Sequence, residues 1–202
     1  MSRKALVIVI LLTVLLADQL LKVWVKTHLL YGQEFAILGW DRALIHFVEN
    51  NGMAFGLSLG GRIGKLLLTG FRVVAVVLLA YYLVRLLREG AGRRLLAAFA
   101  FIEAGALGNI IDSVFYGVLF SESGPHTGVA TFLPEGGGYE SLFFGRVVDM
   151  FYFPLCYGVY PDWVPWLAGR SYLFFRPIFN VADVSISVGV VLLLAVYYRR
   201  RK

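Results

Sequence analysis

Four long apolar stretches decide what this chain can fold into. A helix needs about 20 mainly apolar residues to cross the hydrocarbon core of a bilayer. Stretches of about that length occupy residues 5–25, 66–87, 95–116 and 181–198. Hydrophobic residues make up 59% of the 202 residues and charged residues only 16%, which is too apolar for an ordinary soluble domain. We therefore predict an α-helical membrane protein with four transmembrane helices.

The first stretch resembles a secretory signal, because a basic start precedes an apolar run. The run continues through Asp18 and Gln19 into "LLKVWVK" without the small-residue pattern of a cleavage site. We expect a retained membrane helix.

Basic residues near the helix ends predict the orientation, because they favour the cytoplasmic side. They gather before the first helix, between the second and third, and at the end of the chain: Arg3, Lys4, Arg85, Arg88, Arg93, Arg94, Arg199, Arg200, Arg201 and Lys202. Both termini are then inside, and segments 26–65 and 117–180 lie outside. This topology accounts for the net charge of +6, so the charge does not indicate nucleic-acid binding. We expect one membrane-embedded domain over residues 1–202.

The two outer segments differ in pattern. The first contains "ALIHFVENNGMAFG", a strand-like run followed by a turn-prone "NNG". The second is rich in Gly, Pro and aromatic residues, and Trp163, Trp166 and the run "SYLFF" suit a loop that lies on the bilayer surface. A single cysteine, Cys156, excludes an internal disulfide.

Polar residues inside membrane helices mark functional candidates. Asn109 and Asp112 share one helical face, and Asn180 and Asp183 repeat their spacing at the start of the last helix. Helix capping accounts for the second pair but not the first, which lies toward the C-terminal end of its helix. The topology places both pairs at a similar depth near the outer side of the membrane.

Three further polar residues belong to this group. Asp18 and Lys22 have the spacing and order of a favourable ion pair, which is either purely structural or supports a site. Asp149 is flanked by apolar residues in "GRVVDMFYFP", as on a half-exposed strand or in a buried site. With Asp183 it would form a carboxylate pair, in which one member stays ionised and the other keeps its proton.

A carboxylate pair can activate water for attack on an amide carbonyl. Zinc chemistry is disfavoured because the three histidines lack the spacing of zinc ligands. A serine nucleophile is disfavoured because the sequence has no GxSxG element. A divalent cation held by Asp112, Asp149 and Asp183 stays open. An ion- or proton-coupled carrier also stays open, although the inner halves of the helices are nearly all apolar apart from Glu103. So does a non-catalytic binding scaffold.

Five motifs along the chain resemble those of the lipoprotein signal peptidase family, also called signal peptidase II. They are "DQLLK", "ENNGMAFG", "AGALGNIID", "GRVVDM" and "FNVAD", in the family's order. The resemblance implies an aspartic endopeptidase of the bacterial inner membrane, with four membrane helices and a small periplasmic β-containing cradle. Such an enzyme removes the signal peptide of a prolipoprotein on the N-terminal side of a diacylglyceryl-cysteine, the last-but-one step of lipoprotein maturation.

The resemblance also assigns roles to residues. It implies that Asp149 and Asp183 are catalytic, and that six residues shape the site or contact substrate: Asp18, Lys22, Asn50, Asn109, Asp112 and Asn180. It implies no metal or other cofactor. The expected partners are diacylated prolipoproteins, membrane lipid and globomycin-type inhibitors, and the expected state is a monomer.

The chain departs from the family pattern at three places. Ser113 stands where an Arg is common, and Met53 where a small residue is usual. The insert over residues 119–145 is longer than in common members, and we expect either a lid over the site or a surface excursion.

Overall fold

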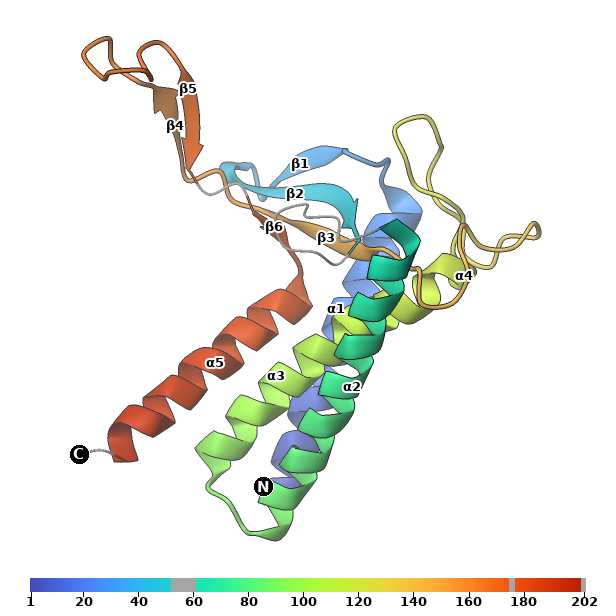
Figure 1. The fold of residues 1–202 in the computed structure, drawn as a ribbon, viewed down its shortest axis with the longest axis vertical. Helices are drawn as coiled ribbons and strands as arrows, with labels where there is room; N and C mark the ends of the chain where they lie inside the picture. Colours follow the sequence, from blue (N-terminus) through green and yellow to red (C-terminus); the bar gives the residue numbers. More distant parts are fainter. Residues whose placement is uncertain (52–60, 175–176, 201–202) are drawn as a thin grey trace.

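Four long helices dominate the computed structural model, which describes residues 1–51, 61–174 and 177–200 (Figure 1). They are α1 (Arg3–His28), α2 (Gly61–Arg88), α3 (Arg93–Ile111) and α5 (Val181–Arg200), and α3 continues through a π-helical turn (Asp112–Tyr116) into α4 (Gly117–Leu119). All four are long and apolar enough to cross a membrane. The four predicted spans are confirmed, each with a few more residues at one or both ends. The predicted departure at Met53 lies outside the described residues.

Helix α3 is the centre of the bundle, because α1, α2 and α5 all pack against it. Small residues allow the close approach. A Cβ atom added at Gly105 would lie 2.2 Å from the carbonyl oxygen of Ala182 in α5. One added at Gly108 would lie 2.6 Å from a carboxylate oxygen of Asp18 in α1. These glycines therefore bring the polar residues of three helices together.

A small antiparallel sheet covers one end of the bundle, called the sheet end below (Figure 1). Its strands lie in the order β1 (Glu34–Ile37), β2 (Trp40–Asn50), β3 (Val147–Tyr152) and β6 (Ile178–Phe179). The predicted strand and the expected β-containing cradle are confirmed. Because β6 ends two residues before α5, the sheet leads directly into the last helix.

One face of the sheet packs on the helices. Phe47, Val148 and Met150 form a buried cluster with Val25 of α1 and Tyr116 of the π-helical turn. Side chains alternate along a strand, so Asp149 points to the opposite face from Val148 and Met150. The packing of β3 therefore fixes the direction of the Asp149 carboxyl.

A buried ion pair joins the sheet to α1. The ammonium group of Lys26 contacts the carboxylate of Glu49 on β2 and donates to Ser123 Oγ over 2.8 Å. The same ammonium lies 5.0 Å from the ring centroid of Tyr139, within range of a cation–π interaction. Ser123 and Tyr139 belong to the insert, which is thereby bound to the sheet end of α1.

The insert also supports the π-helical turn. The backbone N–H groups of Phe143 and Gly145 donate to the carbonyl oxygens of Val114 and Ser113, over 3.0 and 2.9 Å. A Cβ atom at Gly145 would lie 2.0 Å from the carbonyl oxygen of Asp112, so only glycine permits this approach. The insert lies against the sheet end of α3, away from α5 (Figure 1). It is a folded support, and its role as a lid stays a prediction.

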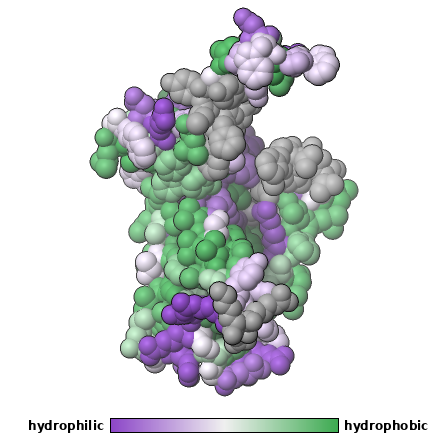
Figure 2. All heavy atoms as spheres, turned by 90° about the vertical axis from the view of Figure 1, so that its left-hand side faces the viewer, coloured by the Kyte–Doolittle hydropathy of each residue, from purple (hydrophilic) through white to green (hydrophobic). Residues whose placement is uncertain are grey.

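The surface matches a protein that spans a bilayer. Figure 2 shows hydrophobic residues over the middle of the face where α5 lies and hydrophilic residues gathered at its lower end. That lower end is opposite the sheet. Arg93 there donates to the carbonyl oxygen of Met1 over 3.0 Å, which joins the start of the chain to the basic connection between α2 and α3. The described members of the basic group that predicted the orientation therefore lie at one end.

The packing at Gly105 predicts the effect of one added methyl group. In Gly105→Ala the Cβ atom meets backbone of α5, so α5 must shift; we expect the free energy of unfolding to fall by roughly 1–3 kcal/mol. The matched control is Gly70→Ala in α2, where a Cβ atom meets nothing within 4 Å. Thermal unfolding in detergent checks both variants. Equal stability of Gly105→Ala and wild type would contradict the close packing.

Candidate active site

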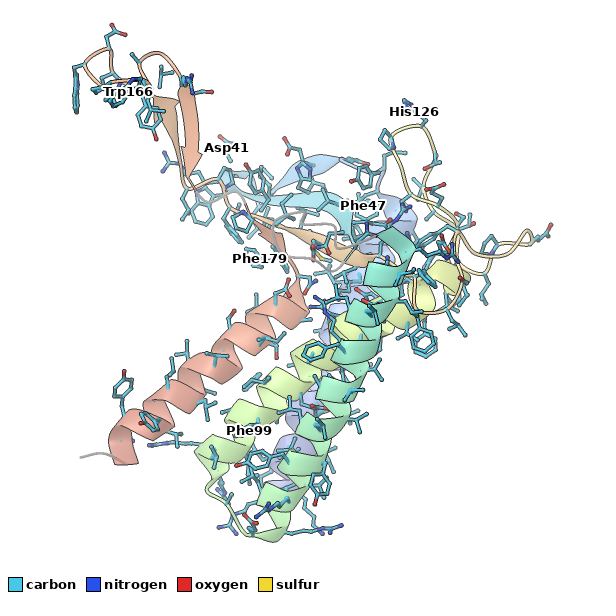
Figure 3. The ribbon with its side chains drawn as sticks, in the orientation of Figure 1. Asp41, Phe47, Phe99, His126, Trp166 and Phe179 are labelled. Atoms are coloured by element: carbon cyan, nitrogen blue, oxygen red, sulfur yellow. The ribbon has the colours of Figure 1, made fainter. Side chains whose placement is uncertain are left out.

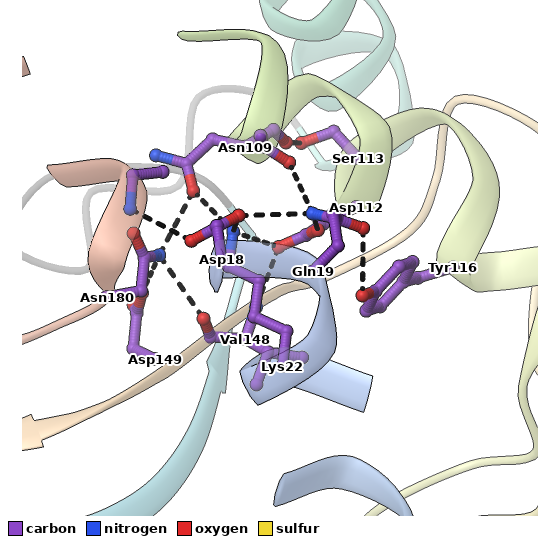
Figure 4. Close-up of polar contacts among 12 residues, drawn as sticks. Asp18, Gln19, Lys22, Asn109, Asp112, Ser113, Tyr116, Val148, Asp149 and Asn180 are labelled. Carbon is purple, nitrogen blue, oxygen red and sulfur yellow. Dashed lines mark hydrogen bonds and ion pairs between the residues drawn. The ribbon is translucent and has the colours of Figure 1, made fainter. Parts of the chain in front are cut away.

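A network of buried polar side chains lies where the sheet meets the ends of α1, α3 and α5 (Figure 4). Within it Asp18, Lys22, Asp112 and Asn180 have no exposed surface, and Asp149 is 4% exposed. Buried polar groups are costly unless they are hydrogen-bonded. The contacts described below satisfy that requirement and bring residues far apart in sequence into one site.

The start of α5 combines a helix cap with a site residue. The backbone N–H of Asp183 donates to Asn180 Oδ1 over 2.9 Å, and the backbone N–H of Asn180 donates to Asp183 Oδ2 over 3.3 Å. This is a reciprocal N-terminal cap. Asp183 Oδ1 also accepts from Asn109 Nδ2 of α3 over 2.9 Å. Capping therefore explains the local fold of "FNVAD" without excluding a further role.

Asn180 also links the two carboxylates. Its Nδ2 donates to Asp149 Oδ1 over 2.7 Å, while its backbone N–H reaches Asp183. The other oxygen of Asp149 accepts from the side-chain amide of Asn50 at the end of β2. Both oxygens of Asp149 thus have neutral amide donors.

Burial sets the protonation of Asp149. It raises the pKa of the Asp149 carboxyl to about 7, with a further contribution from the negative charge of Asp183. The charge of Lys22 and the bond from Asn180 oppose this rise. Near neutral pH the carboxyl of Asp149 therefore keeps its proton far more readily than that of an ordinary aspartate, which is ionised.

Lys22 holds two further carboxylates together. Its ammonium group lies 2.9 Å from Asp18 Oδ2 and 2.7 Å from Asp112 Oδ2, and it donates to Asn109 Oδ1 over 2.9 Å. Asp18 and Lys22 therefore form the expected ion pair, and this ion pair is also part of the polar network.

Asp18 and Asp112 each accept a hydrogen bond from the backbone next to Asp183 or Asp149. Asp18 Oδ1 accepts from the backbone N–H of Ala182 over 2.9 Å, and Ala182 precedes Asp183. Asp112 Oδ2 accepts from the backbone N–H of Val148 over 3.3 Å, and Val148 precedes Asp149. The Lys22 cluster thus sets the positions of both.

All eight residues named from the sequence meet in this network, but two more belong to it. Gln19 Nε2 donates to Asp18 Oδ2 and Asp112 Oδ1 over 3.1 and 3.0 Å, and Gln19 Oε1 accepts from Tyr116 Oη over 3.1 Å. The sequence did contain a signal for Gln19, because it is a polar residue next to Asp18 inside an apolar helix. It contained no signal for Tyr116, because the inward direction of that side chain depends on the π-helical turn.

The structure also bears on the metal alternative. Asp112 contacts the ammonium group of Lys22, which competes with a cation for the same oxygens. Over residues 1–51, 61–174 and 177–200, no cluster of three or more His, Cys, Asp or Glu side chains is arranged to hold a metal ion. Among the described residues, Asp112, Asp149 and Asp183 are therefore not arranged as one cation site.

An apolar groove of about 600 Å³ begins at Asp183 and follows α5. Its lining residues are Phe179, Asp183, Val184, Ser187, Val188, Val191 and Leu192. Figure 3 shows Phe179 where the sheet meets the first turn of α5. An extended apolar segment placed in this groove would lie beside a carboxylate.

Solved structures share this fold. Two solved structures, each described as a bacterial membrane enzyme, match this chain with TM-scores of 0.64 and 0.60 at 22% and 23% sequence identity. The first comparison covers 97% of this chain and 89% of the other, and the second covers 95% and 91%.

Sequence comparisons identify the family. A protein of Porphyromonas gingivalis named lipoprotein signal peptidase is 50% identical over 186 residues, which cover 92% of this chain and 79% of that protein. One of Amoebophilus asiaticus with the same name is 38% identical over 181 residues, which cover 88% and 71%. The family model described as signal peptidase (SPase) II matches residues 10–199. With nearly its whole length matched, the chain belongs to the signal peptidase II family.

Proposed function

We propose that this multi-pass membrane protein is an aspartic endopeptidase that removes the signal peptide from diacylglyceryl-prolipoproteins. It cleaves on the N-terminal side of the lipidated cysteine, with Asp149 and Asp183 as the catalytic pair. The observation that carries the proposal is the contact of Asn180 with both carboxylates, together with the pKa of about 7 at Asp149. Family membership supports the reaction class.

The two aspartates differ in a way that suits acid–base catalysis. Asp149 is buried on a strand and holds its proton readily, whereas Asp183 is half-buried at the start of a helix. The helix dipole favours a negative charge at that end. Asp183 is therefore the base that accepts a proton from water, and Asp149 is the acid that donates to the carbonyl oxygen. The pair titrates as a unit, so these are roles within one coupled system.

Each proton and bond in the reaction has a place. The water oxygen bonds to the scissile carbonyl carbon while its proton moves to Asp183 and the proton of Asp149 moves to the carbonyl oxygen. In the tetrahedral intermediate the C–N bond then breaks. The departing amine takes a proton from Asp183, and Asp149 recovers its proton from the collapsing hydroxyl. The pair returns to its starting state without a metal or covalent intermediate.

The groove beside Asp183 suits a substrate that is itself in the membrane. Its lining is apolar along α5, so the hydrophobic part of a signal peptide can lie there with the scissile bond near the carboxylate. We place the sheet end at the periplasmic face of the inner membrane, since the described basic residues of the chain start and of the connection between α2 and α3 lie at the opposite end. A globomycin-type inhibitor would occupy the same region, and the chain would act as a monomer.

The carrier alternative is less well supported. Alternating access requires polar sites that can be reached from both sides of the membrane in turn. The described network lies where the sheet meets α1, α3 and α5 (Figure 4), and Glu103 is buried in α3 outside it.

Replacement of either catalytic aspartate should abolish cleavage. Asp149→Asn and Asp183→Asn each remove one proton-transfer group, and we expect the rate to fall by about 100- to 10,000-fold. Cleavage of a diacylated prolipoprotein by the purified variants in detergent with a metal chelator checks this. Asp41→Asn is the matched control, because Asp41 is exposed on the sheet, and it should keep wild-type activity. Full activity of either catalytic variant would remove the pair from the mechanism.

The pKa of Asp149 predicts the pH dependence. Below about 7 the carboxyl keeps its proton and can act as the acid; above it the proton is lost. We expect kcat/KM to fall as pH rises through about 7, approaching a tenfold loss per pH unit. A peptide substrate without groups that titrate in this range is needed, and the thermal unfolding temperature across the same range controls for unfolding. A constant rate from about pH 6 to about pH 9 would refute the assignment.

We propose that Lys22 and its two carboxylates position the catalytic pair. Lys22→Met leaves Asp18 and Asp112 buried without their counter-charge, which should lower the stability by roughly 3–5 kcal/mol. In the double variant Lys22→Met/Asp112→Asn one of the two unpaired negative charges is removed, so part of the lost stability should be recovered. Thermal unfolding in detergent measures both, with exposed Lys4→Met as the control. If Lys22→Met were as stable as wild type, the cluster would have no such role.

A further inference from the structure

Strand β3, which carries Asp149, continues into a separate two-stranded hairpin. The strands β4 (Cys156–Val159) and β5 (Ser171–Phe174) pair in antiparallel register from Cys156 with Phe174 to Val159 with Ser171. The tip between them is closed by backbone hydrogen bonds. Tyr160 N donates to Arg170 O over 2.9 Å, and Gly169 N donates to Tyr160 O over 3.0 Å. The tip is therefore a folded loop with a defined outer surface.

That outer surface presents two tryptophans. Trp163 is 80% exposed and Trp166 is 92% exposed. Such exposure is unusual, because a large aromatic side chain normally buries much of its apolar surface. Val159 beside them is 61% exposed. The tip thus directs its apolar groups outward instead of packing them on the protein.

The backbone at Trp166 gives a second indication. Its φ is 62°, in the left-handed region, where a bulky side chain is rare and glycine or asparagine is the usual occupant. An unfavourable backbone conformation that holds an indole outward points to a use for that side chain.

The position of the hairpin in the chain restricts what can cover it. β3 leads into β4, and β5 is followed by β6, which ends two residues before α5 begins. Both ends of the hairpin are thus tied to the sheet end of a membrane-spanning helix. The hairpin leans outward on the side of α5, whereas the loop that carries His126 rises from the other side of the sheet (Figures 1 and 3). The hairpin therefore projects from the sheet on the side of α5, and its chain connections tie it to the first turn of that helix.

We propose that the β4–β5 hairpin is a membrane-surface anchor whose tip inserts Trp163 and Trp166 into the interface of the leaflet at the sheet end. Indole rings favour this region, where the apolar ring meets the acyl chains and the N–H meets headgroups and water. The tip carries one acid and one base, Asp162 and Arg170, so the attraction is apolar rather than electrostatic. The anchor would fix the height of β3, and with it Asp149, above the hydrocarbon core.

Depth-dependent quenching of tryptophan fluorescence tests the anchor. The chain has four tryptophans, so single-tryptophan variants are made by replacing the other three with Phe. Each full-length variant is reconstituted into phosphatidylcholine–phosphatidylglycerol vesicles with brominated acyl chains. Variants that keep only Trp163 or only Trp166 should lose most of their emission to bromine near the headgroups and little to aqueous acrylamide.

Two matched variants calibrate the measurement. Trp24 lies in the last turns of α1 and is 42% exposed, so a variant with Trp24 alone should be quenched by brominated lipid. A His126→Trp change in the tryptophan-free chain places an indole on the other exposed loop, which should be quenched by acrylamide only.

Either of two results would overturn the proposal. In the first, Trp163 and Trp166 behave like an indole at residue 126. In the second, they are shielded only at high protein-to-lipid ratios, which would mean that a second copy covers the tip. The readout does not involve cleavage, so it is independent of the proposed peptidase function.

Discussion

The buried ammonium group of Lys22 is the interaction on which the rest of the site depends. In the membrane-spanning part of a bundle a charge must be paired, and Lys22 pairs with Asp18 on its own helix and Asp112 on another. Each of these carboxylates also accepts one backbone N–H: Asp18 accepts that of Ala182 on its other oxygen, and Asp112 accepts that of Val148 on the oxygen that faces Lys22. Charge neutralisation and positioning are thus one arrangement, and it spans a helix and a strand that are far apart in sequence.

The origin of the two candidate catalytic groups explains their difference. A strand buried on both faces removes Asp149 from water, while the first turn of a helix leaves Asp183 partly exposed beside an apolar groove. Burial on the strand raises the pKa of the Asp149 carboxyl, which favours its neutral form. No additional device is needed to separate their roles.

Hydropathy and spacing predicted much of this from the sequence. Four spans follow from apolar length, and the meeting of Asn109 with Asp183 follows from two helices that pass the same depth in opposite directions. Other features depend on contacts that no local pattern encodes. The inward direction of Tyr116 requires the π-helical turn, which in turn requires N–H donors from the insert. The pairing of Lys26 with Glu49 requires the register of β2, and two such charges look solvated in the sequence.

The reciprocal cap at the start of α5 joins the chemistry to the local stability of a helix. In the proposed mechanism, Asp183 takes up a proton once per turnover, and a neutral carboxyl is a weaker acceptor than a carboxylate. During that interval the bonds from Asn180 and Asn109 to its oxygens weaken together. The first turn of α5 would then loosen in step with bond cleavage, so that the enzyme relaxes its hold on the groove when the severed peptide has to leave.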